Sequence, residues 1–258
     1  MSTPANPTHA GHDHAGQDHG WFAPIDAYCE RVGQGLFAEP LNAVTNLAFV
    51  AGAVYLWFAA GKGAPPDARR VRSARTLAVL LLAIGLASGA FHTFANRLTA
   101  MLDSLSIVVF VTVFLVQATR SLLGWRFGGQ LGVILAWLGA SIGLAVLCPS
   151  LTCAYLPSVA SAGLFGLVCW RTRRPIAKLF LLAAGVLVLS LALRSLDEPL
   201  CDLNPYGTHF LWHLCNAAAL TLCGRALAKA MHQSAGEAGD KTSSSASADT
   251  GSPPRSSA

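Results

Sequence analysis

The sequence TLAVLLLAIGLASGAFHTFA, at residues 76–95, is a run of twenty residues without a single Asp, Glu, Lys or Arg. A helix of about 20 apolar residues is long enough to cross the hydrocarbon core of a bilayer. A helix also satisfies its own backbone polar groups in lipid. Similar runs occupy residues 41–60, 102–118, 130–147, 155–170, 179–196 and 208–223. Together the seven runs predict an all-α integral membrane bundle of seven transmembrane helices.

The composition agrees with a membrane protein and excludes several other classes. Of the 258 residues, 53% are hydrophobic and only 12% are charged, whereas ordinary soluble domains carry about 25% charged residues. The long apolar runs exclude a disordered chain, a disulfide-dense secreted domain and a coiled coil. The net charge of +5 does not indicate a nucleic-acid partner, because the basic residues lie between the apolar runs. The lipid bilayer is the expected partner, and the sequence indicates no particular protein partner.

The two ends of the chain differ from its centre. Residues 24–230 form the expected membrane domain, and the Ser-rich residues 231–258 lack the apolar content to pack, so we expect a disordered cytoplasmic tail. Residues 1–23 contain no apolar core of a signal peptide and are expected to be a flexible leader. A histidine tract in this leader is either a weak transition-metal site or simply part of a polar leader; its members are His9, His12, His14 and His19.

The basic residues between the runs predict the orientation of the chain. Cytoplasmic loops of membrane proteins carry an excess of Lys and Arg. On one side of the expected spans there are only Arg31, Arg97 and Arg194. On the other side there are thirteen, namely Lys62, Arg69, Arg70, Arg72, Arg75, Arg120, Arg126, Arg171, Arg173, Arg174, Lys178, Arg225 and Lys229. We therefore expect the N-terminus outside, in a periplasmic or lumenal space, and the C-terminus in the cytoplasm.

Four of the seven cysteines are expected on the outer side, namely Cys29, Cys148, Cys153 and Cys201. An oxidising exterior permits disulfides, and four cysteines allow three pairings. Cys148 and Cys153 share the short loop CPSLTC, so their pairing is the local choice and leaves Cys29 with Cys201. The alternative is that all four are free thiols. The cysteines within the spans are expected to be small buried side chains.

A few polar side chains interrupt the apolar runs, and ionisable groups at membrane depth mark a functional site by default. Ser88 and His92 lie near the end of the second run, Asp103 lies at the start of the third, and His209 and His213 lie at the start of the last. Ser88 and His92 are four residues apart, and so are His209 and His213, so the members of each pair share one helix face.

These side chains are expected to lie at one depth. His92 is ~24 Å along its span at ~1.5 Å per residue, just below the outer boundary of a hydrocarbon core of ~30 Å. The third and seventh spans start at that boundary, so Asp103, His209 and His213 reach the same layer. Three imidazoles with an open fourth position match a catalytic zinc site. The alternative is that the histidines form interhelical hydrogen bonds and that Asp103 is a helix-start acid.

The motifs SGAFH at 88–92 and HFLWH at 209–213, with Asp103 eleven residues after the first histidine, resemble the alkaline ceramidase family. The stretch YCERVGQGLFAEPLNAVTNLAF at 28–49 is also similar to the opening of that family. The resemblance covers about residues 24 to 225. It implies a seven-span membrane hydrolase, in a superfamily that also includes the progestin/adiponectin-type receptors.

The resemblance further implies roles for particular residues. It implies that zinc is bound by His92, His209 and His213, that Ser88 and Asp103 complete the site, and that Cys29 is bridged to Cys201. Animal members of the family carry a calcium site in the N-terminal stretch, where Asp26, Glu30 and Glu39 are the corresponding acids here. The spacing from Cys29 to Glu39 is shorter and an asparagine ligand has no counterpart, so the alternative is that these acids form a solvated face.

The function that these residues predict is zinc-dependent hydrolysis of the amide bond of an N-acyl lipid, ceramide or a ceramide-like lipid. Zinc would activate water and polarise the carbonyl, Asp103 would move the proton to the leaving amine, and Ser88 would stabilise the oxyanion. The products are a fatty acid and a sphingoid base or other amine. The alternative is a non-enzymatic, receptor-like or scaffold protein with a structural metal, which needs a fourth protein ligand; Cys215 is nearest but faces away from His213.

Overall fold

The chain is helical almost throughout. The computed structural model describes residues 20–33, 35–61, 68–148 and 151–249, so the histidine tract of the leader lies outside the described residues. One isolated bridge joins Pro24 to Asn96. The helical elements are α1 (Pro40–Thr45), α2 (Leu47–Ala59), α3 (Ala68–Phe94), α4 (Arg97–Ala118), η1 (Thr119–Leu123), α5 (Phe127–Leu147), η2 (Leu151–Tyr155), α6 (Leu156–Arg171), α7 (Ala177–Leu196), η3 (Glu198–Leu200) and α8 (His209–Asp249).

The predicted membrane bundle is confirmed. Six helical segments in the described part of the chain are long and apolar enough to cross a membrane, and each matches an expected span: Pro40–Ala59, Ala68–Phe94, Arg97–Leu123, Phe127–Leu147, Thr152–Arg171 and Ala177–Leu196. The last expected span corresponds to the start of α8. It falls outside that group because His209, His213 and Asn216 interrupt its apolar sequence, and all three are buried.

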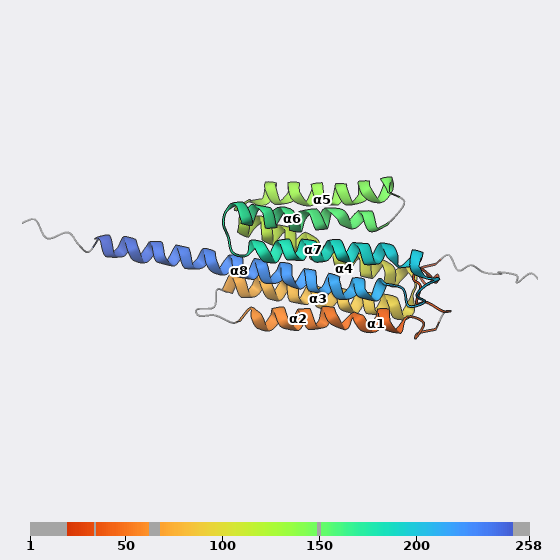
Figure 1. Cartoon of the computed structure of the whole chain (residues 1–258). Helices are drawn as coiled ribbons and strands as arrows, with labels where there is room; N and C mark the ends of the chain where they lie inside the picture. Colours follow the sequence, from red (N-terminus) through yellow and green to blue (C-terminus); the bar gives the residue numbers. More distant parts are fainter. Residues whose placement is uncertain (1–19, 34, 62–67, 149–150, 250–258) are drawn as a thin grey trace, which may run out of the picture.

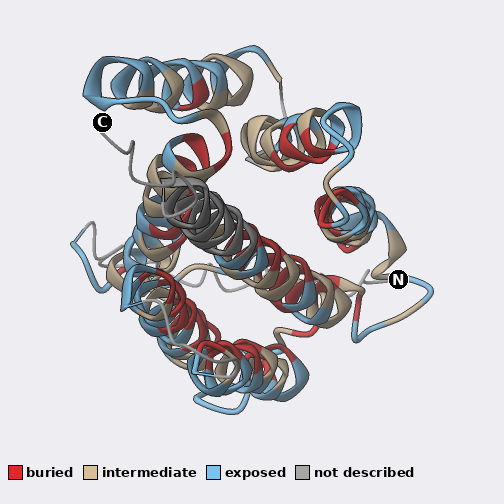
Figure 2. Ribbon diagram, turned by 90° about the vertical axis from the view of Figure 1, so that its left-hand side faces the viewer, coloured by how far each residue is buried: buried red, intermediate tan, exposed pale blue. Residues whose placement is uncertain are grey.

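The packing explains why α8 can carry these polar residues. The helices lie lengthwise side by side, and α8 packs against α7, α3 and α2 (Figure 1). By contrast, α5 lies at the outside, where it contacts α4 and α6 and exposes Leu135, Ile142 and Val146. Buried residues lie on helix faces turned toward neighbouring helices, and exposed residues lie on the outer faces (Figure 2). The apolar outer faces are therefore available to lipid, while α8 meets mainly protein.

The close contact between α2 and α8 depends on a residue without a side chain. A Cβ atom added at Gly52 on α2 would lie only 2.2 Å from Oγ1 of Thr221 on α8. Small residues of this kind let membrane helices approach closely. This close approach places α2 directly against α8, the last helix.

The first expected span is divided into two helices. Helix α1 ends at Thr45 and α2 begins at Leu47, with Asn46 between them. The Asn46 side chain donates to the carbonyl of Asn42 over 2.8 Å, and such local bonds compete with regular helix geometry. The short α1 carries Thr45, with Glu39 directly before it, so both residues can reach the interior of the bundle.

The last helix is longer than its expected span. The sequence predicts a disordered tail from residue 231, whereas the structure continues α8 to Asp249. Residues 233–249 include four Ala, which favour helix, and extension of an existing helix needs no new nucleation. Residues 250–258 lie outside the described part, so the tail stays a prediction there.

Candidate metal centre

The three predicted histidine ligands meet at one end of the bundle. His92 lies in the last turn of α3, His209 is the first residue of α8, and His213 lies one turn later. Their side chains are 0–1% exposed. One potential ligand nitrogen from each lies within 4.8 Å of the other two. Among the described residues this is the one such group of His, Cys, Asp or Glu side chains, so residues from opposite ends of the sequence form a compact cluster.

The nitrogens of this cluster fit a metal ion. The Nε2 atoms of His92 and His213 and both ring nitrogens of His209 are buried without a hydrogen-bond partner in the described part of the chain. Buried polar atoms are almost always paired, so several unpaired nitrogens that face one another indicate that a further group belongs between them. Imidazole nitrogens favour zinc and related transition metals over magnesium or calcium.

Hydrogen bonds orient two of the histidines. Nδ1 of His92 lies 2.5 Å from Oε2 of Glu39, and Nδ1 of His213 lies 3.0 Å from Oγ1 of Thr45. A carboxylate can only accept, and the Thr45 hydroxyl donates to the carbonyl of Leu41 over 2.7 Å. Both contacts therefore place the imidazole proton on Nδ1 and leave the lone pair of Nε2 free. Partners of this kind orient metal-bound histidines and raise their basicity.

Stacking positions the third histidine. The ring of His209 lies between Tyr28, at 3.8 Å between centroids, and Trp212, at 5.0 Å, and both pairs are stacked. Tyr28 comes from the N-terminal segment and Trp212 from α8. The flat faces of His209 are thus covered, which leaves its ring edge for hydrogen bonding or metal binding.

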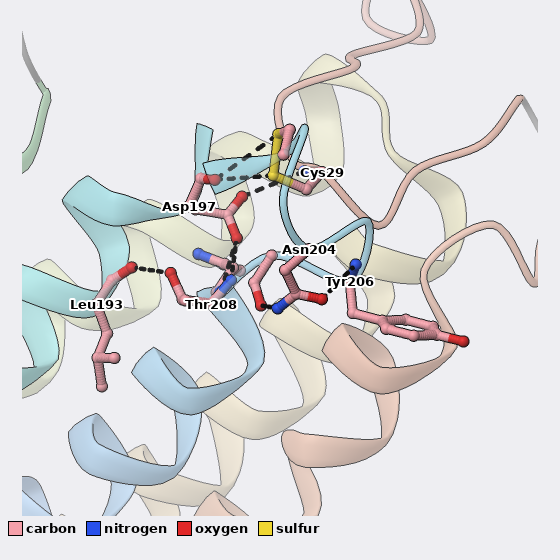
Figure 3. The surroundings of a disulfide bond; sticks show 9 residues. Cys29, Leu193, Asp197, Asn204, Tyr206 and Thr208 are labelled. Atoms are coloured by element: carbon pink, nitrogen blue, oxygen red, sulfur yellow. Dashed lines mark hydrogen bonds between the residues drawn. A yellow bond between two sulfur atoms is a disulfide. The ribbon is translucent and has the colours of Figure 1, made fainter. Parts of the chain in front are cut away.

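A buried carboxylate that no sequence motif indicates, Asp197, fixes the start of α8. Oδ1 of Asp197 accepts from the backbone N–H of Thr208 over 2.6 Å and of His209 over 2.8 Å, as Figure 3 shows for the surroundings of the disulfide. Oδ2 accepts from the N–H of Cys29 over 3.2 Å. The first N–H groups of a helix have no partner within the helix, and a negative charge is favourable there.

Gly207 is part of the same arrangement. Its φ of +62° is in the left-handed region, and a Cβ at this position would lie 2.1 Å from Oδ1 of Asp197. A glycine here therefore lets the chain turn closely around the carboxylate. The hydroxyl of Thr208 also donates to the carbonyl of Leu193, which ties the start of α8 to α7 (Figure 3).

Both predicted disulfides are present. Cys29 is bridged to Cys201, and Cys148 is bridged to Cys153. The cysteines within the spans are free thiols, namely Cys169, Cys215 and Cys223. The Cys29–Cys201 bridge joins the segment that carries Tyr28 to the loop before α8, so it holds two walls of the histidine cluster together.

The two catalytic candidates lie beside the cluster. Ser88 is buried one turn before His92 on α3. Asp103 lies on α4, whose start is fixed by a capping box between Asn96 and Thr99, and it is within electrostatic reach of Ser88 and His92. Oγ of Ser88 and Oδ1 of Asp103 have no hydrogen-bond partner within 3.5 Å among the described residues, but the two side chains interact with each other, and Asp103 also attracts Arg194. Ser88 and Asp103 thus form a polar pair beside the cluster.

The predicted calcium ligands do not come together as a metal-binding group within the described residues. Asp26 is exposed. Both oxygens of Glu30 accept backbone N–H bonds at the start of α1, from Leu41 over 2.6 Å and Asn42 over 2.8 Å. Glu30 therefore caps a helix with the protein's own donors.

Glu39 is also bound by the protein itself. Its carboxylate pairs with the guanidinium of Arg31 and accepts from the side chain of Asn42 over 3.1 Å, in addition to its contact with His92. Burial by itself would raise the pKa of Glu39, but the hydrogen bonds from His92, Asn42 and Arg31 lower that pKa below its usual value. Arg31 further donates to the carbonyl of His92 over 3.3 Å. Glu39 therefore supports the histidine cluster both directly and through Arg31.

An apolar cleft begins next to the cluster. It lies between α4, α6, α7 and α8, and its lining includes Phe110, Phe114, Ala162, Leu187, Trp212 and Leu220. Trp212 belongs to both features, because its ring also stacks on His209. The space is narrow, about 40 Å³, and its Trp212 end lies next to the histidine cluster.

Comparison with curated proteins found no match. The family model described as Ceramidase matches residues 25–247, which include the histidine cluster, Ser88, Asp103 and nearly all of the helical bundle. The matched region covers most of the chain, and the buried histidines, the membrane helices and the two disulfides agree with it. The chain belongs to the Ceramidase family.

Proposed function

We propose that this protein is a zinc-dependent hydrolase that cleaves the amide bond of an N-acyl lipid, ceramide or a ceramide-like lipid. The products are a fatty acid and a sphingoid base or other amine. The observation that carries the proposal is the convergence of unpaired nitrogens from His92, His209 and His213 in a chain of the Ceramidase family.

The three histidines would hold the metal. When bound, zinc supplies a Lewis acid that polarises the amide carbonyl and lowers the pKa of water at the site. Glu39 and Thr45 hold two of the imidazoles with their Nε2 atoms free. Tyr28 and Trp212 keep bulk water away from the faces of His209.

Asp103 and Ser88 act on the substrate. The carboxylate of Asp103 accepts a proton from the attacking water and delivers it to the leaving amine, as a general base and then a general acid. The hydroxyl of Ser88 donates a hydrogen bond to the amide oxygen as that oxygen gains negative charge. Their Oδ1 and Oγ atoms, which have no hydrogen-bond partner within 3.5 Å among the described residues, support these roles.

The acyl chain would enter along the apolar cleft, which is only about 40 Å³ in this structure and so has to widen, with the amide at the end near Trp212. The site opens toward the outer side of the membrane in the orientation that the basic residues predict. Figure 1 supports this assignment, because the C-terminal end of α5, which Cys148 follows directly, lies at the same end of the bundle as α1. Both disulfides thus lie at one end, and disulfides persist in oxidising compartments.

The alternative is a receptor-like or scaffold protein with a structural metal. A structural zinc site is closed by four protein ligands, whereas a catalytic site leaves one position open. The cluster contains three side chains, and within the described residues no fourth His, Cys, Asp or Glu belongs to it. This composition favours the hydrolase.

The test is a hydrolysis assay of purified protein with a panel of N-acyl lipids. The protein is assayed as prepared, after treatment with a chelator, and after addition of zinc. We expect release of fatty acid that disappears with the chelator and returns with zinc. A zinc-loaded protein that cleaves none of these lipids would contradict the proposal and favour the receptor-like alternative.

A further inference from the structure

A positive charge lies next to the metal centre with no carboxylate at ion-pair distance in the described part of the chain. Arg194 is in the last turn of α7. Its guanidinium carbon lies 5.2 Å from the ring centre of Trp212, 5.6 Å from Tyr155 and 5.9 Å from Tyr28. One nitrogen donates to the hydroxyl of Tyr28 over 3.3 Å. Three aromatic rings thus surround the cation.

The aromatic rings hold the charge but do not neutralise it. In the described part of the chain the carboxylate ion pairs are those of Glu39, with Arg31 and with His92, so no described carboxylate lies within 4 Å of Arg194. Arg31 is therefore ion-paired, whereas Arg194 has only the longer-range attraction of Asp103, the acid beside the histidine cluster. A guanidinium offers several N–H donors, and one hydrogen bond to the protein is present. Removing a charge from water is costly unless partners stabilise it.

The neighbours of Arg194 connect it to both parts of the site. Tyr28 and Trp212 stack on the metal-ligand candidate His209. Tyr155 and Trp212 line the apolar cleft. Arg194 is accordingly positioned where the cleft meets the metal centre, which is where the part of an N-acyl lipid next to its amide would lie.

We propose that Arg194 binds an anionic group of the substrate, so that the preferred substrate is an N-acyl lipid with a carboxylate or phosphate near the scissile amide. This inference rests on the proposed amide hydrolase function. A planar guanidinium matches carboxylate and phosphate oxygens and can bind them with two parallel hydrogen bonds. The surrounding rings orient the guanidinium without competing for its remaining N–H groups.

The test compares two lipids with the same acyl chain. One is a neutral ceramide, and the other carries a carboxylate or phosphate next to the amide. For each lipid, kcat/KM is measured with the zinc-loaded wild-type protein, Arg194→Gln and Arg194→Lys. Arg97→Gln is the matched control, because Arg97 is another arginine on the same expected side of the membrane, at the start of α4.

We expect the wild-type protein to prefer the anionic lipid. Arg194→Gln should lower kcat/KM for the anionic lipid by about 10- to 100-fold, mainly through KM, which is the range for a hydrogen bond to a charged group. Its kcat/KM for the neutral lipid should fall by a clearly smaller factor, because that lipid has no group that pairs with the guanidinium, and the loss that remains reports the attraction between Arg194 and Asp103. Arg194→Lys should retain part of the preference, and Arg97→Gln should behave as wild type.

Other results would overturn the inference. Equal losses for both lipids would mean that Arg194 acts on the amide itself. A wild-type preference for the neutral lipid would exclude an anionic substrate. If Arg194→Gln does not fold, Arg194→Lys still decides, because a ratio of kcat/KM between the two lipids equal to that of wild type would contradict the inference.

A binding measurement separates this inference from the proposed function. Metal-free protein is mixed with each lipid in detergent, and the shift in the midpoint of thermal unfolding is recorded. We expect a larger shift with the anionic lipid, and loss of the difference in Arg194→Gln. Charge-selective binding without hydrolysis by the zinc-loaded protein would refute the hydrolase proposal alone, whereas hydrolysis without charge selectivity would refute the role of Arg194 alone.

Discussion

The backbone N–H of His209 donates a 2.8 Å hydrogen bond to Oδ1 of Asp197, which lies twelve residues earlier in the chain. The same carboxylate accepts from Thr208 and Cys29. Asp197→Ala removes the acceptor, and each buried donor left without a partner costs ~1–3 kcal/mol. We therefore expect this variant to unfold at a lower temperature and to hold zinc more weakly.

Thermal unfolding in detergent and metal content by elemental analysis check this expectation. Glu198→Ala is the matched control, because Glu198 is the next residue and is exposed. If Asp197→Ala keeps the unfolding temperature and zinc content of Glu198→Ala, Asp197 does not hold the start of α8.

The contact between Glu39 and His92 predicts an effect on metal affinity. Glu39→Gln keeps the size of the side chain but removes the charge that Arg31 and His92 share. Loss of such a partner of a metal-bound histidine weakens metal binding by about 10- to 100-fold. Competition with a chelator measures the Kd for zinc, with Glu198→Gln as control. An unchanged Kd would show that Glu39 has no influence on the ligand.

The histidine cluster predicts one zinc ion per chain. To exclude the leader, the measurement uses a protein in which Ala replaces the tract of His9, His12, His14 and His19. In this background His213→Ala should lose the metal, because two imidazoles remain of the three. His232→Ala, a change on the exposed far part of α8, should keep it. Undiminished zinc in His213→Ala would sink the ligand assignment.

Asp103 separates a hydrolase from a receptor-like protein. Asp103→Asn preserves the shape of the side chain but removes the base, so turnover should fall by about 10²–10⁴-fold while zinc content stays the same. Both quantities are measured on one preparation, with the exposed Asp202→Asn as control. Retained activity with retained zinc would refute the proton transfer proposed for Asp103, and loss of zinc would assign it to metal binding.

The Cys29–Cys201 bridge closes a sequence separation of 172 residues. In the chain-entropy model a long closed loop of this kind stabilises the folded state by up to ~4–5 kcal/mol. We expect Cys29→Ser to unfold at a markedly lower temperature than wild type, whereas Cys215→Ser, which removes a free thiol, should change little. Mass spectrometry of a non-reduced digest should find the linked peptides. Free alkylation of both thiols without reductant would contradict the bridge.

Periodicity and charge are sufficient to predict the bundle and the layer of the histidines. Apolar runs of about 20 residues specify spans directly, and spacing along each span gives the depth of its side chains. This is why the amino-acid sequence alone assigns His92, His209 and His213 to one site. The seventh expected span is the least apolar of the seven. Its polar residues are buried against other helices, and a hydropathy average does not show which way a side chain faces.

The supporting residues could not be predicted in the same way. Asp197 reaches α8 through a turn at Gly207 and through a loop whose path the spacing does not specify. The family resemblance suggests calcium for Glu39, but its oxygens bind Arg31, Asn42 and His92, and this depends on how the N-terminal segment folds over the bundle. In the sequence Arg194 is only a basic residue on the expected outer side, because its aromatic neighbours come from three separate parts of the chain.

The route of the chain through the histidine cluster has a consequence for biosynthesis. The cluster takes supporting residues from before and within α1, one histidine from α3 and two from α8. The disulfide of Cys29 can form only after Cys201 has been synthesised. During synthesis the early helices enter the membrane long before the ribosome has translated residue 213. A chain that stops short of that point inserts as a helical membrane protein without a complete ligand set. The proposed activity therefore requires the chain as far as His213, and a shorter unfinished copy would lack the three-histidine site.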